Sequence, residues 1–127
     1  MQLHFLVDKK EILFLILQNK TMFTEEQIEA VWQKASIMPN NDPNVFRQDY
    51  AGAWIKRDQY DRSDTKYGWT INFNKPIKDG GTEELSNCYP LHWRNAQAKG
   101  DNYPSWTLVL SSEENKNIEK VTSWNTK

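Results

Sequence analysis

The sequence has few of the residues that build disulfides and metal clusters. Cys88 is its only cysteine, and it has two histidines. One cysteine excludes an internal disulfide and any zinc knuckle made from cysteine pairs. This cysteine usage predicts a cytoplasmic protein.

Long apolar runs are also absent. The longest, residues 12–17, has six residues, whereas a helix needs about 20 to span a bilayer. The stretch before it has neither the basic start nor the small-residue cleavage site of an export signal. The sequence therefore predicts no membrane partner.

Neither sign of charge is in excess. The 16 Lys and Arg residues and the 17 Asp and Glu residues give a formal net charge of −1, so the overall charge does not indicate a nucleic-acid partner. Residues 56–100 carry eight basic and six acidic side chains. This weak excess is typical of a solvated surface, so any nucleic-acid contact must be local.

Aromatic residues are what the chain has in quantity. They make up 13% of its 127 residues and include six Trp, and large rings supply much buried area. A chain of this length buries one core and is too short for two ordinary domains. We expect core packing for Trp32, Trp54, Trp69, Trp93 and Trp106. The alternative is that exposed tryptophans stack on the bases of a single strand.

A helix is predicted to begin at Thr24. The Thr24 hydroxyl can cap it, Gln27 can complete a capping box, and Phe23 can pack on Ile28. The apolar positions that follow at helical spacing are Ile28, Val31, Trp32 and Ala35. Pro39 is expected to end this run.

Met22 stands immediately before this helix start. Its position leads to the hypothesis that the native protein starts at Met22 and that residues 1–21 are an upstream extension. We therefore divide the chain into an N-terminal extension (residues 1–22), a folded domain (residues 23–110) and a polar, partly ordered C-terminal tail (residues 111–127).

The middle of the chain has the pattern of a strand, a loop and a helix. Residues 69–73 alternate apolar with polar side chains and predict a strand, which Pro76 and a turn at Gly80 and Gly81 end. A long loop is expected up to Pro90, followed by a helix over residues 91–99 that Gly100 terminates. Residues 107–110 predict a final strand. The predicted fold class is α+β.

The span from Trp69 to Lys99 resembles the ββα-metal core of the HNH endonucleases. In that family an acidic residue and a histidine end the first strand, and a proline and a Gly-Gly turn follow. An asparagine then sits in the loop, and a helix supplies the last metal ligand. The positions that fall in register here are Pro76, Gly80, Gly81, Asn87, Leu91 and Lys99. The likeness extends over about residues 23–106 and is similar to one bacterial branch of the family. It implies a small HNH-like core, made of a β-hairpin, a long loop and a helix, with an added N-terminal helix.

The residues that carry the family's chemistry are replaced in this chain. The resemblance places the metal ligands at Asn72 and Ala96 and the general base at Phe73. Phenylalanine has no proton acceptor, and a positioned base contributes roughly 10²–10⁴-fold in rate. Asparagine offers only a neutral oxygen and alanine no ligand, whereas Mg²⁺ is held mainly by carboxylates. We therefore expect no nuclease activity and no metal cofactor, although the family would use a divalent ion such as Mg²⁺.

Asn87 is the residue of the motif that remains, and the resemblance gives it the role of fixing the loop by hydrogen bonds. The candidate contacts to DNA or RNA phosphates are Lys75, Lys78, Arg94 and Lys99, because they flank the strand, loop and helix. Lys99 can equally compensate the dipole at its helix end. The zinc-binding cysteine pairs of many relatives are missing, which leaves cohesion to the aromatic core.

His92 and Cys88 are the two remaining candidates for reactive chemistry. We expect His92 to be a surface or half-buried residue, and Cys88 to be a small core residue. Three function classes stay open. They are an inactive HNH-like domain that binds nucleic acid, a protein-interaction module, and an active nuclease with an unconventional site built on His92 and Asn87.

Overall fold

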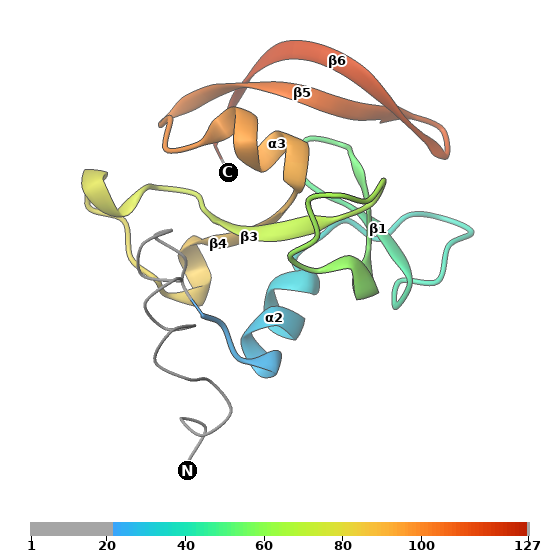
Figure 1. Ribbon diagram of the computed structural model, residues 1–127, viewed down its shortest axis with the longest axis horizontal. Coiled ribbons are helices and arrows are strands. Elements are labelled where there is room, and N and C mark those ends of the chain that lie inside the picture. The colour runs from blue at the N-terminus through green and yellow to red at the C-terminus, as the bar shows by residue number, and fades with distance from the viewer. Residues whose placement is uncertain (1–21, 127) are drawn as a thin grey trace.

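The computed structural model describes residues 22–126. These residues form two α-helices, α2 (Glu25–Trp32) and α3 (Trp93–Lys99), and three two-stranded antiparallel sheets. The sheets pair β1 (Phe46–Gln48) with β2 (Trp54–Lys56), β3 (Trp69–Phe73) with β4 (Cys88–His92), and β5 (Ser105–Glu113) with β6 (Lys116–Asn125). Short 3-10 turns lie at Arg57–Gln59, Ile77–Asp79 and Leu85–Asn87. The α+β class is confirmed. Figure 1 shows β3 and β4 in the middle of the molecule, with α2 on one side and α3 and the β5–β6 hairpin on the other.

The capping box predicted for α2 is confirmed. The backbone N–H of Gln27 donates to the Thr24 hydroxyl at 3.1 Å, and the Thr24 N–H donates to Gln27 Oε1 at 2.8 Å. The helix ends at Trp32, earlier than expected. The buried Arg47 side chain donates to the carbonyls of Gln33 and Ala35. These carbonyls are thereby satisfied without the hydrogen bonds of a further helical turn.

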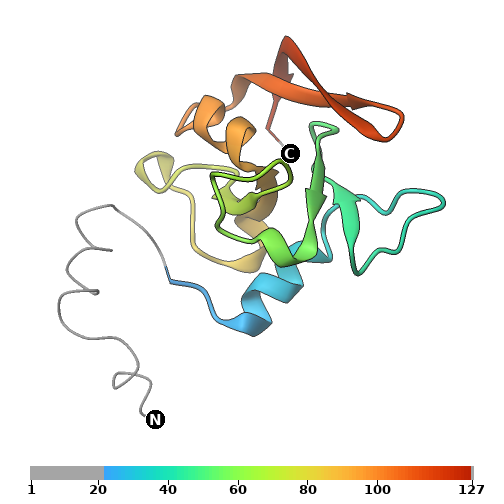
Figure 2. The ribbon, with the colours of Figure 1, turned by 45° about the vertical axis from the view of Figure 1, so that its right-hand side comes forward.

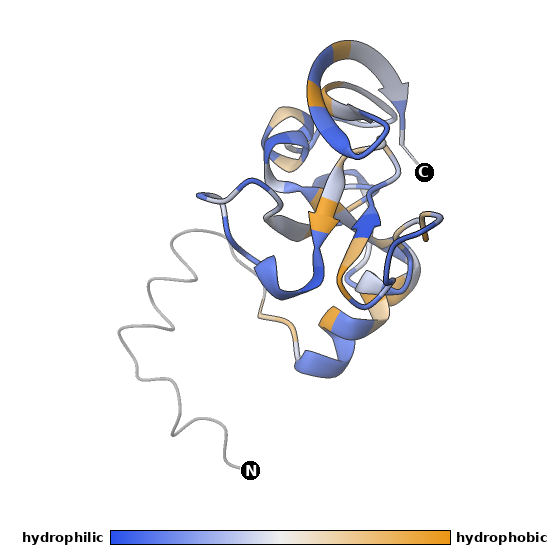
Figure 3. Ribbon diagram, turned by 90° about the vertical axis from the view of Figure 1, so that its right-hand side faces the viewer, coloured by the Kyte–Doolittle hydropathy of each residue, from blue (hydrophilic) through white to orange (hydrophobic). Residues whose placement is uncertain are grey.

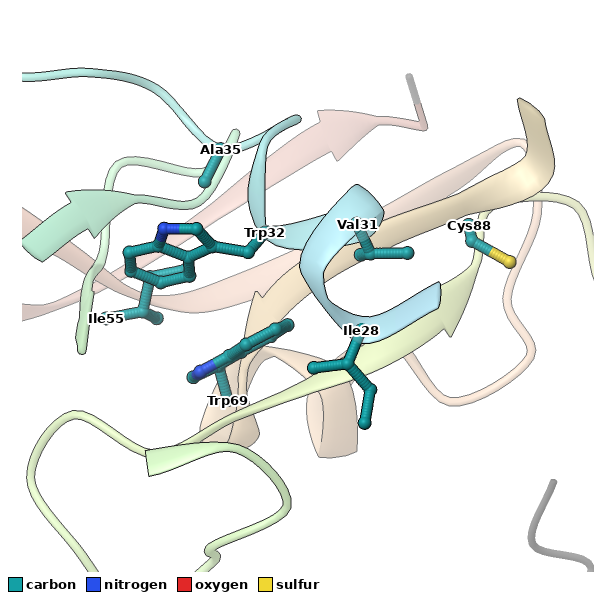
Figure 4. Packing of buried hydrophobic residues seen from close by; sticks show 7 residues of the cluster. All are labelled: Ile28, Val31, Trp32, Ala35, Ile55, Trp69 and Cys88. Atoms are coloured by element: carbon teal, nitrogen blue, oxygen red, sulfur yellow. The ribbon is translucent and has the colours of Figure 1, made fainter. Parts of the chain in front are cut away.

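The core lies in two clusters, one on each side of the β3–β4 ribbon. The first is centred on Trp32 and Trp69, whose ring centroids are 5.4 Å apart, and it fills the space between α2 and β3 (Figure 4). The second consists of Ala51, Leu91, Trp106 and Leu108 and joins β4 to β5. Trp54 is buried as well, so four of the five tryptophans expected in the core are there, and Trp93 is half-buried. Figure 3 shows apolar stretches on α2 and the central strands, with hydrophilic loops around them.

The loop predicted up to Pro90 is wrong in its last three residues, because Cys88–His92 forms β4. The helix predicted over residues 91–99 begins only at Trp93. Pro90 lies opposite Ile71 in the register of the ribbon. The flanking bonds, Trp93 N–H to Gly68 O and Asn74 N–H to Asn87 O, make that pair a non-hydrogen-bonded one. The missing N–H of Pro90 therefore costs no ladder bond, and a strand is possible where the proline argues against one.

The polar tail predicted for residues 111–127 is also wrong, because Lys116–Asn125 forms β6. Figure 2 shows β5 and β6 as one long, curved ribbon. Backbone pairing with β5 holds β6 in place, so no apolar pattern is needed. Asn117 adds a side-chain clamp, since its Oδ1 accepts from the Trp54 N–H at 2.6 Å and its Nδ2 donates to the Trp54 carbonyl at 3.1 Å.

The hypothesis that the native chain starts at Met22 concerns residues 1–21, which lie outside the described residues.

Candidate functional site: two clefts beside β3

The two faces of β3 serve different parts of the molecule. Side chains alternate along a strand, so Ile71 and Phe73 lie on the side of α2, where both pack on the first core cluster. Thr70 and Asn72 lie on the other side, opposite Leu91 and Tyr89 of β4. This second face meets α3.

A cleft lies between β3, α3 and the loop that precedes β3. It has a volume of about 620 Å³ and is lined by Asn72, Ala96 and Gln97, together with Asp61, Arg62 and Ser63 of the loop. We call it the Ala96 cleft. A neighbouring cleft of about 410 Å³ is lined by Phe23, Tyr60, Ile71, Asn72, Phe73 and Ile77, among others. We call it the Phe23 cleft.

The structure brings the predicted catalytic positions together only in pairs. Asn72 lines both clefts, Ala96 lines only the Ala96 cleft, and Phe73 lines only the Phe23 cleft. The reason is the alternation of the strand, which turns the side chains of residues 72 and 73 to opposite faces of β3. The two positions assigned to metal ligands therefore face each other, whereas the ring at the base position packs against Phe23 at a centroid distance of 6.2 Å.

Lys99 brings a positive charge to the same region. Its side chain is fully buried, and Nζ donates to the Phe73 carbonyl at 3.2 Å. Burial lowers the pKa of Lys99 from its usual value, and Asp101 opposes that shift. Lys99 is thus an internal cation that holds the end of β3 against α3, and in this conformation its ammonium group does not reach a phosphate outside.

The three positions that the resemblance assigns to the chemistry do not fit a divalent cation, and Asp61 brings the one carboxylate of the Ala96 cleft lining. Asn72 contributes one neutral amide oxygen, Ala96 and Phe73 contribute no side-chain ligand, and Mg²⁺ prefers anionic carboxylates. The nearby charge of Lys99 would repel a bound cation. Within residues 22–126, no group of three or more His, Cys, Asp or Glu side chains is placed to hold a metal ion. No chemical step through a metal is therefore derived for this site.

Asn87 holds the β3–β4 loop as the resemblance implies. Its Oδ1 accepts from the Lys75 N–H at 2.9 Å, and its Nδ2 donates to the carbonyls of Lys75 and Thr82 at 2.9 and 2.7 Å. Gly81 closes the same loop tightly, because a Cβ there would lie 1.8 Å from the Lys75 carbonyl oxygen. The loop therefore keeps its shape without any catalytic residue.

His92 is buried, which corrects the expectation of a surface or half-buried residue. It is the N-cap of α3, where Nδ1 accepts from the Arg94 N–H at 3.1 Å and Nε2 lies 2.8 Å from the Lys66 carbonyl. A carbonyl only accepts, so Nε2 carries the proton and the imidazole is neutral. Burial lowers the pKa of His92. Both ring nitrogens are occupied, which leaves none to act as a general base.

His92 and Asn87 are also separated along β4. Asn87 precedes the strand and His92 ends it, and five residues of extended chain span roughly 16 Å. A shared catalytic site for these two residues does not exist in this structure.

Cys88 is buried, as expected, and its thiol lies 3.3 Å from the Glu84 carbonyl oxygen. Burial raises the pKa of the thiol, so it is not an activated nucleophile.

The cations predicted to contact phosphates are mostly engaged. Arg94 pairs with Glu119 at 3.2 Å, and Lys78 pairs with Asp79 at 3.4 Å. The Lys75 ammonium lies 5.9 Å from the centre of the Tyr103 ring. Of the four predicted residues, Lys75, Lys78 and Arg94 are open to solvent at least in part, and Lys99 is not.

Sequence reasoning missed a buried polar network that positions α3. The carboxylate of Asp49 accepts from the backbone N–H groups of Ala51, Ala53 and His92 at 2.8–3.0 Å, and from Asn95 Nδ2 at 3.3 Å. Asn95 in turn bonds to Leu110 of β5 through Oδ1 and Nδ2. The bonds to Ala51 and Ala53 are local, but those to His92 and Asn95 span 43 and 46 positions, so no local pattern signals the whole network.

Comparison with known proteins gives no relative: no protein-family model, no curated protein and no solved structure matches this chain. Among the described helices, none is both long enough and apolar enough to cross a bilayer.

Proposed function

We propose that this chain is a catalytically inactive HNH-like domain that uses the clefts beside β3 for binding. One observation carries the proposal: Asn72 on β3 and Ala96 on α3 line the same cleft, in a β3–loop–β4–α3 arrangement. The resemblance assigns the metal ligands to these two positions. Here they supply one neutral oxygen between them. On this proposal the scaffold is kept and the groups that polarise a phosphodiester are missing.

Restoring the replaced residues tests this proposal. We compare the wild-type chain with a triple variant, Asn72→Asp, Phe73→His and Ala96→Asn, in plasmid cleavage with Mg²⁺, Mn²⁺, Ni²⁺ or Zn²⁺. A matched control carries Asn102→Asp alone, which adds the same charge outside both clefts. We expect no cleavage by the wild type or the control, and any cleavage only by the triple variant. Equal cleavage by the wild type and the triple variant would overturn the site assignment.

The geometry of Phe73 adds a second comparison. Residue 73 faces Phe23 rather than the Ala96 cleft, so a histidine there must turn around the strand edge to reach the substrate. The double variant Asn72→Asp and Ala96→Asn is therefore expected to gain Mn²⁺ affinity without gaining cleavage. Isothermal titration with Mn²⁺ measures this, and cleavage by the double variant would show that residue 73 is not the base position.

Binding without cleavage has two candidate ligands. For nucleic acid, Lys75 and Lys78 are the cations of the β3–β4 loop, and both are open to solvent at least in part. Binding through phosphates falls steeply with salt, with a slope of about −0.9 per phosphate neutralised on duplex DNA. Lys75→Gln should reduce that slope by about one unit, and Lys116→Gln, on the far hairpin, is the matched control.

A protein ligand is the second candidate, and exposed apolar side chains favour it. Ile77 and Leu85 lie on the β3–β4 loop and are 50% and 48% exposed, while the cations around them are largely paired. Exposed apolar side chains mark a protein contact where they form one patch, and these two belong to the same loop. Capture of a protein that tolerates high salt and is lost in Ile77→Asp would support this reading, and salt-sensitive capture of DNA or RNA would contradict it.

A further inference from the structure

The β3 strand has one paired edge and one open edge. The bonds from Trp93 N–H to Gly68 O and from Asn74 N–H to Asn87 O fix which backbone groups face β4. By alternation, residues 70 and 72 also face β4, and residues 69, 71 and 73 face away from it. At the two ends of this outer edge, the Trp69 carbonyl accepts from the Asp61 N–H at 2.7 Å and the Phe73 carbonyl accepts from Lys99 Nζ at 3.2 Å.

Ile71 stands between these two bonds, with its amide and carbonyl pointing outward. The Phe23 cleft lies directly there, because it touches residues 70, 71, 72 and 73 in succession. Successive residues point to opposite faces of a strand, so a cleft that touches all four runs along the edge of β3 rather than over one face. An open strand edge beside an apolar cleft is a template for another strand.

The chain itself carries a segment suited to this edge. Residues 12–17 are the longest apolar run of the sequence, and they are followed after a short interval by Phe23, which lines the cleft. Six residues of chain reach at most about 20 Å, so residue 17 is tethered close to the cleft. Lys9, Lys10 and Lys20 flank the run, and Asp61 and Asp101 line the cleft against the single basic Lys78.

We propose that residues 12–17 add as a strand to the outer edge of β3 and fill the Phe23 cleft. The tether makes the contact intramolecular, with an effective concentration in the millimolar range. The added strand gives partners to the amide and carbonyl of Ile71 and covers the apolar side chains of Phe23 and Phe73.

Hydrogen exchange of single amides in the full-length chain tests this. The Ile71 amide points to the cleft and the Asn72 amide points to β4, so Asn72 serves as an internal reference for folding. Two variants break the segment on alternate faces: Leu13→Asp with Leu15→Asp, and Phe14→Asp with Ile16→Asp. Leu3→Asp with Leu6→Asp is the matched control, since it has the same charge change outside the segment.

We expect the Ile71 amide to exchange at least about tenfold faster in one or both segment variants than in the wild type and the control, while the Asn72 amide is unchanged. The double variant whose replaced side chains face the cleft should show the larger increase in the exchange rate of the Ile71 amide. If Ile71 exchanges at the same rate in all four proteins, the proposal is overturned. Loss of protection at Asn72 would be unfolding, and the Ile71 result is then taken from the single variant Leu15→Ser under the same criterion.

Concentration separates this arrangement from strand exchange between two copies. An intramolecular strand gives Ile71 protection that is independent of protein concentration in a monomer, as judged by sedimentation. Protection that grows with concentration and accompanies a dimer would overturn the tethered arrangement. The outcome is distinguishable from that of the proposed function, because the cleavage test depends only on residues 72, 73 and 96.

Discussion

Asp49 is the residue on which the junction between β1, β4 and α3 depends. Its buried carboxylate accepts four N–H groups from three segments of chain. Burial raises the pKa of Asp49 to about 6, while those N–H groups oppose the shift. At pH 7 the carboxylate is therefore mainly ionised, and its charge is met only by hydrogen bonds.

Asp49→Asn should destabilise the protein by about 3 kcal/mol. The side-chain amide of the new asparagine has one oxygen instead of two, and its own N–H groups would face N–H groups that now donate to Asp49. Each buried donor left without an acceptor costs about 1–3 kcal/mol. Chemical denaturation at pH 7 measures the change. Asp64→Asn, which alters an exposed carboxylate paired with Arg62, should stay within about 0.5 kcal/mol. Equal stabilities of the two variants would mean that the network does not hold the fold.

His92 gives the stability of the protein a dependence on pH. Burial lowers its pKa below the ordinary value of 6.5. The unfolded chain therefore binds a proton at a higher pH than the folded chain does. The contribution of the neutral imidazole is complete above about pH 6.5 and is lost as the pH falls toward the lowered pKa, by at most about 1.4 kcal/mol per pH unit.

The comparison with His92→Asn isolates this effect, because asparagine can still cap α3 but does not titrate. Denaturant midpoints between pH 5 and pH 7.5 should fall more steeply with acid in the wild type than in the variant. Parallel curves would show that His92 titrates alike in both states. His4 is present in both proteins and does not affect the difference.

At the scale of elements, the β3–β4 loop is organised by one side chain. Asn87 makes three hydrogen bonds to the backbone of residues 75 and 82. Asn87→Ala should cost about 2 kcal/mol and make residues 76–86 more sensitive to protease, because the freed backbone groups lose their partners. Ser86→Ala is the exposed neighbouring control. Unchanged proteolysis would mean that Gly81 and Pro76 shape the loop without Asn87.

Local signals explain which elements could be predicted from the sequence. Thr24 and Gln27 bond only within one helical turn, and the alternation in residues 69–73 is a property of one strand, so α2 and β3 were both predicted with correct starts. The role of Asn87 in fixing the loop was predicted from the family resemblance. Its hydrogen bonds stay within one loop, between residues 75 and 87. Gly100 has a φ of 52° and ends α3 where a terminating glycine was expected.

Long-range pairing explains what could not be predicted. Pro90 argues against a strand until the register opposite Ile71 is known. β6 is polar and is held by β5. Asp49 gives no sign of burial because two of its four partners, His92 and Asn95, lie 43 and 46 positions away. At the candidate site, the resemblance predicted that Asn72, Phe73 and Ala96 share one site. It could not show that the first two face opposite sides of β3, or that Lys99 turns inward to the Phe73 carbonyl.

At the scale of the molecule, side-chain hydrogen bonds fasten the C-terminal hairpin to the β1–β2 sheet. Asn117 clamps the backbone of Trp54, Ser111 donates to the Ala51 carbonyl at 2.9 Å, and Gln48 donates to Ser112 at 2.9 Å. These bonds link the β5–β6 hairpin to the β1–β2 sheet. Figure 1 shows the hairpin extending over α3 toward that sheet.

Asn117→Ala should lower the free energy of unfolding by about 2–3 kcal/mol, since both bonds to Trp54 are lost and the Trp54 N–H is left without an acceptor. Asn125→Ala, on an exposed position of the same strand, should change it by less than about 0.5 kcal/mol. Thermal unfolding of both variants measures the difference. If the bonds of Asn117 do not hold the hairpin to the β1–β2 sheet, the two variants would unfold at the same temperature.

Each of the three described sheets pairs two strands that are consecutive in the sequence. Arg47 lies opposite Ile55, Ile71 opposite Pro90, and Leu108 opposite Thr122, and the pair most distant in sequence, Trp69 and His92, is 23 positions apart. Closing such short loops costs little chain entropy. During synthesis on the ribosome, each ribbon could thus close soon after its second strand emerges, without waiting for the rest of the protein.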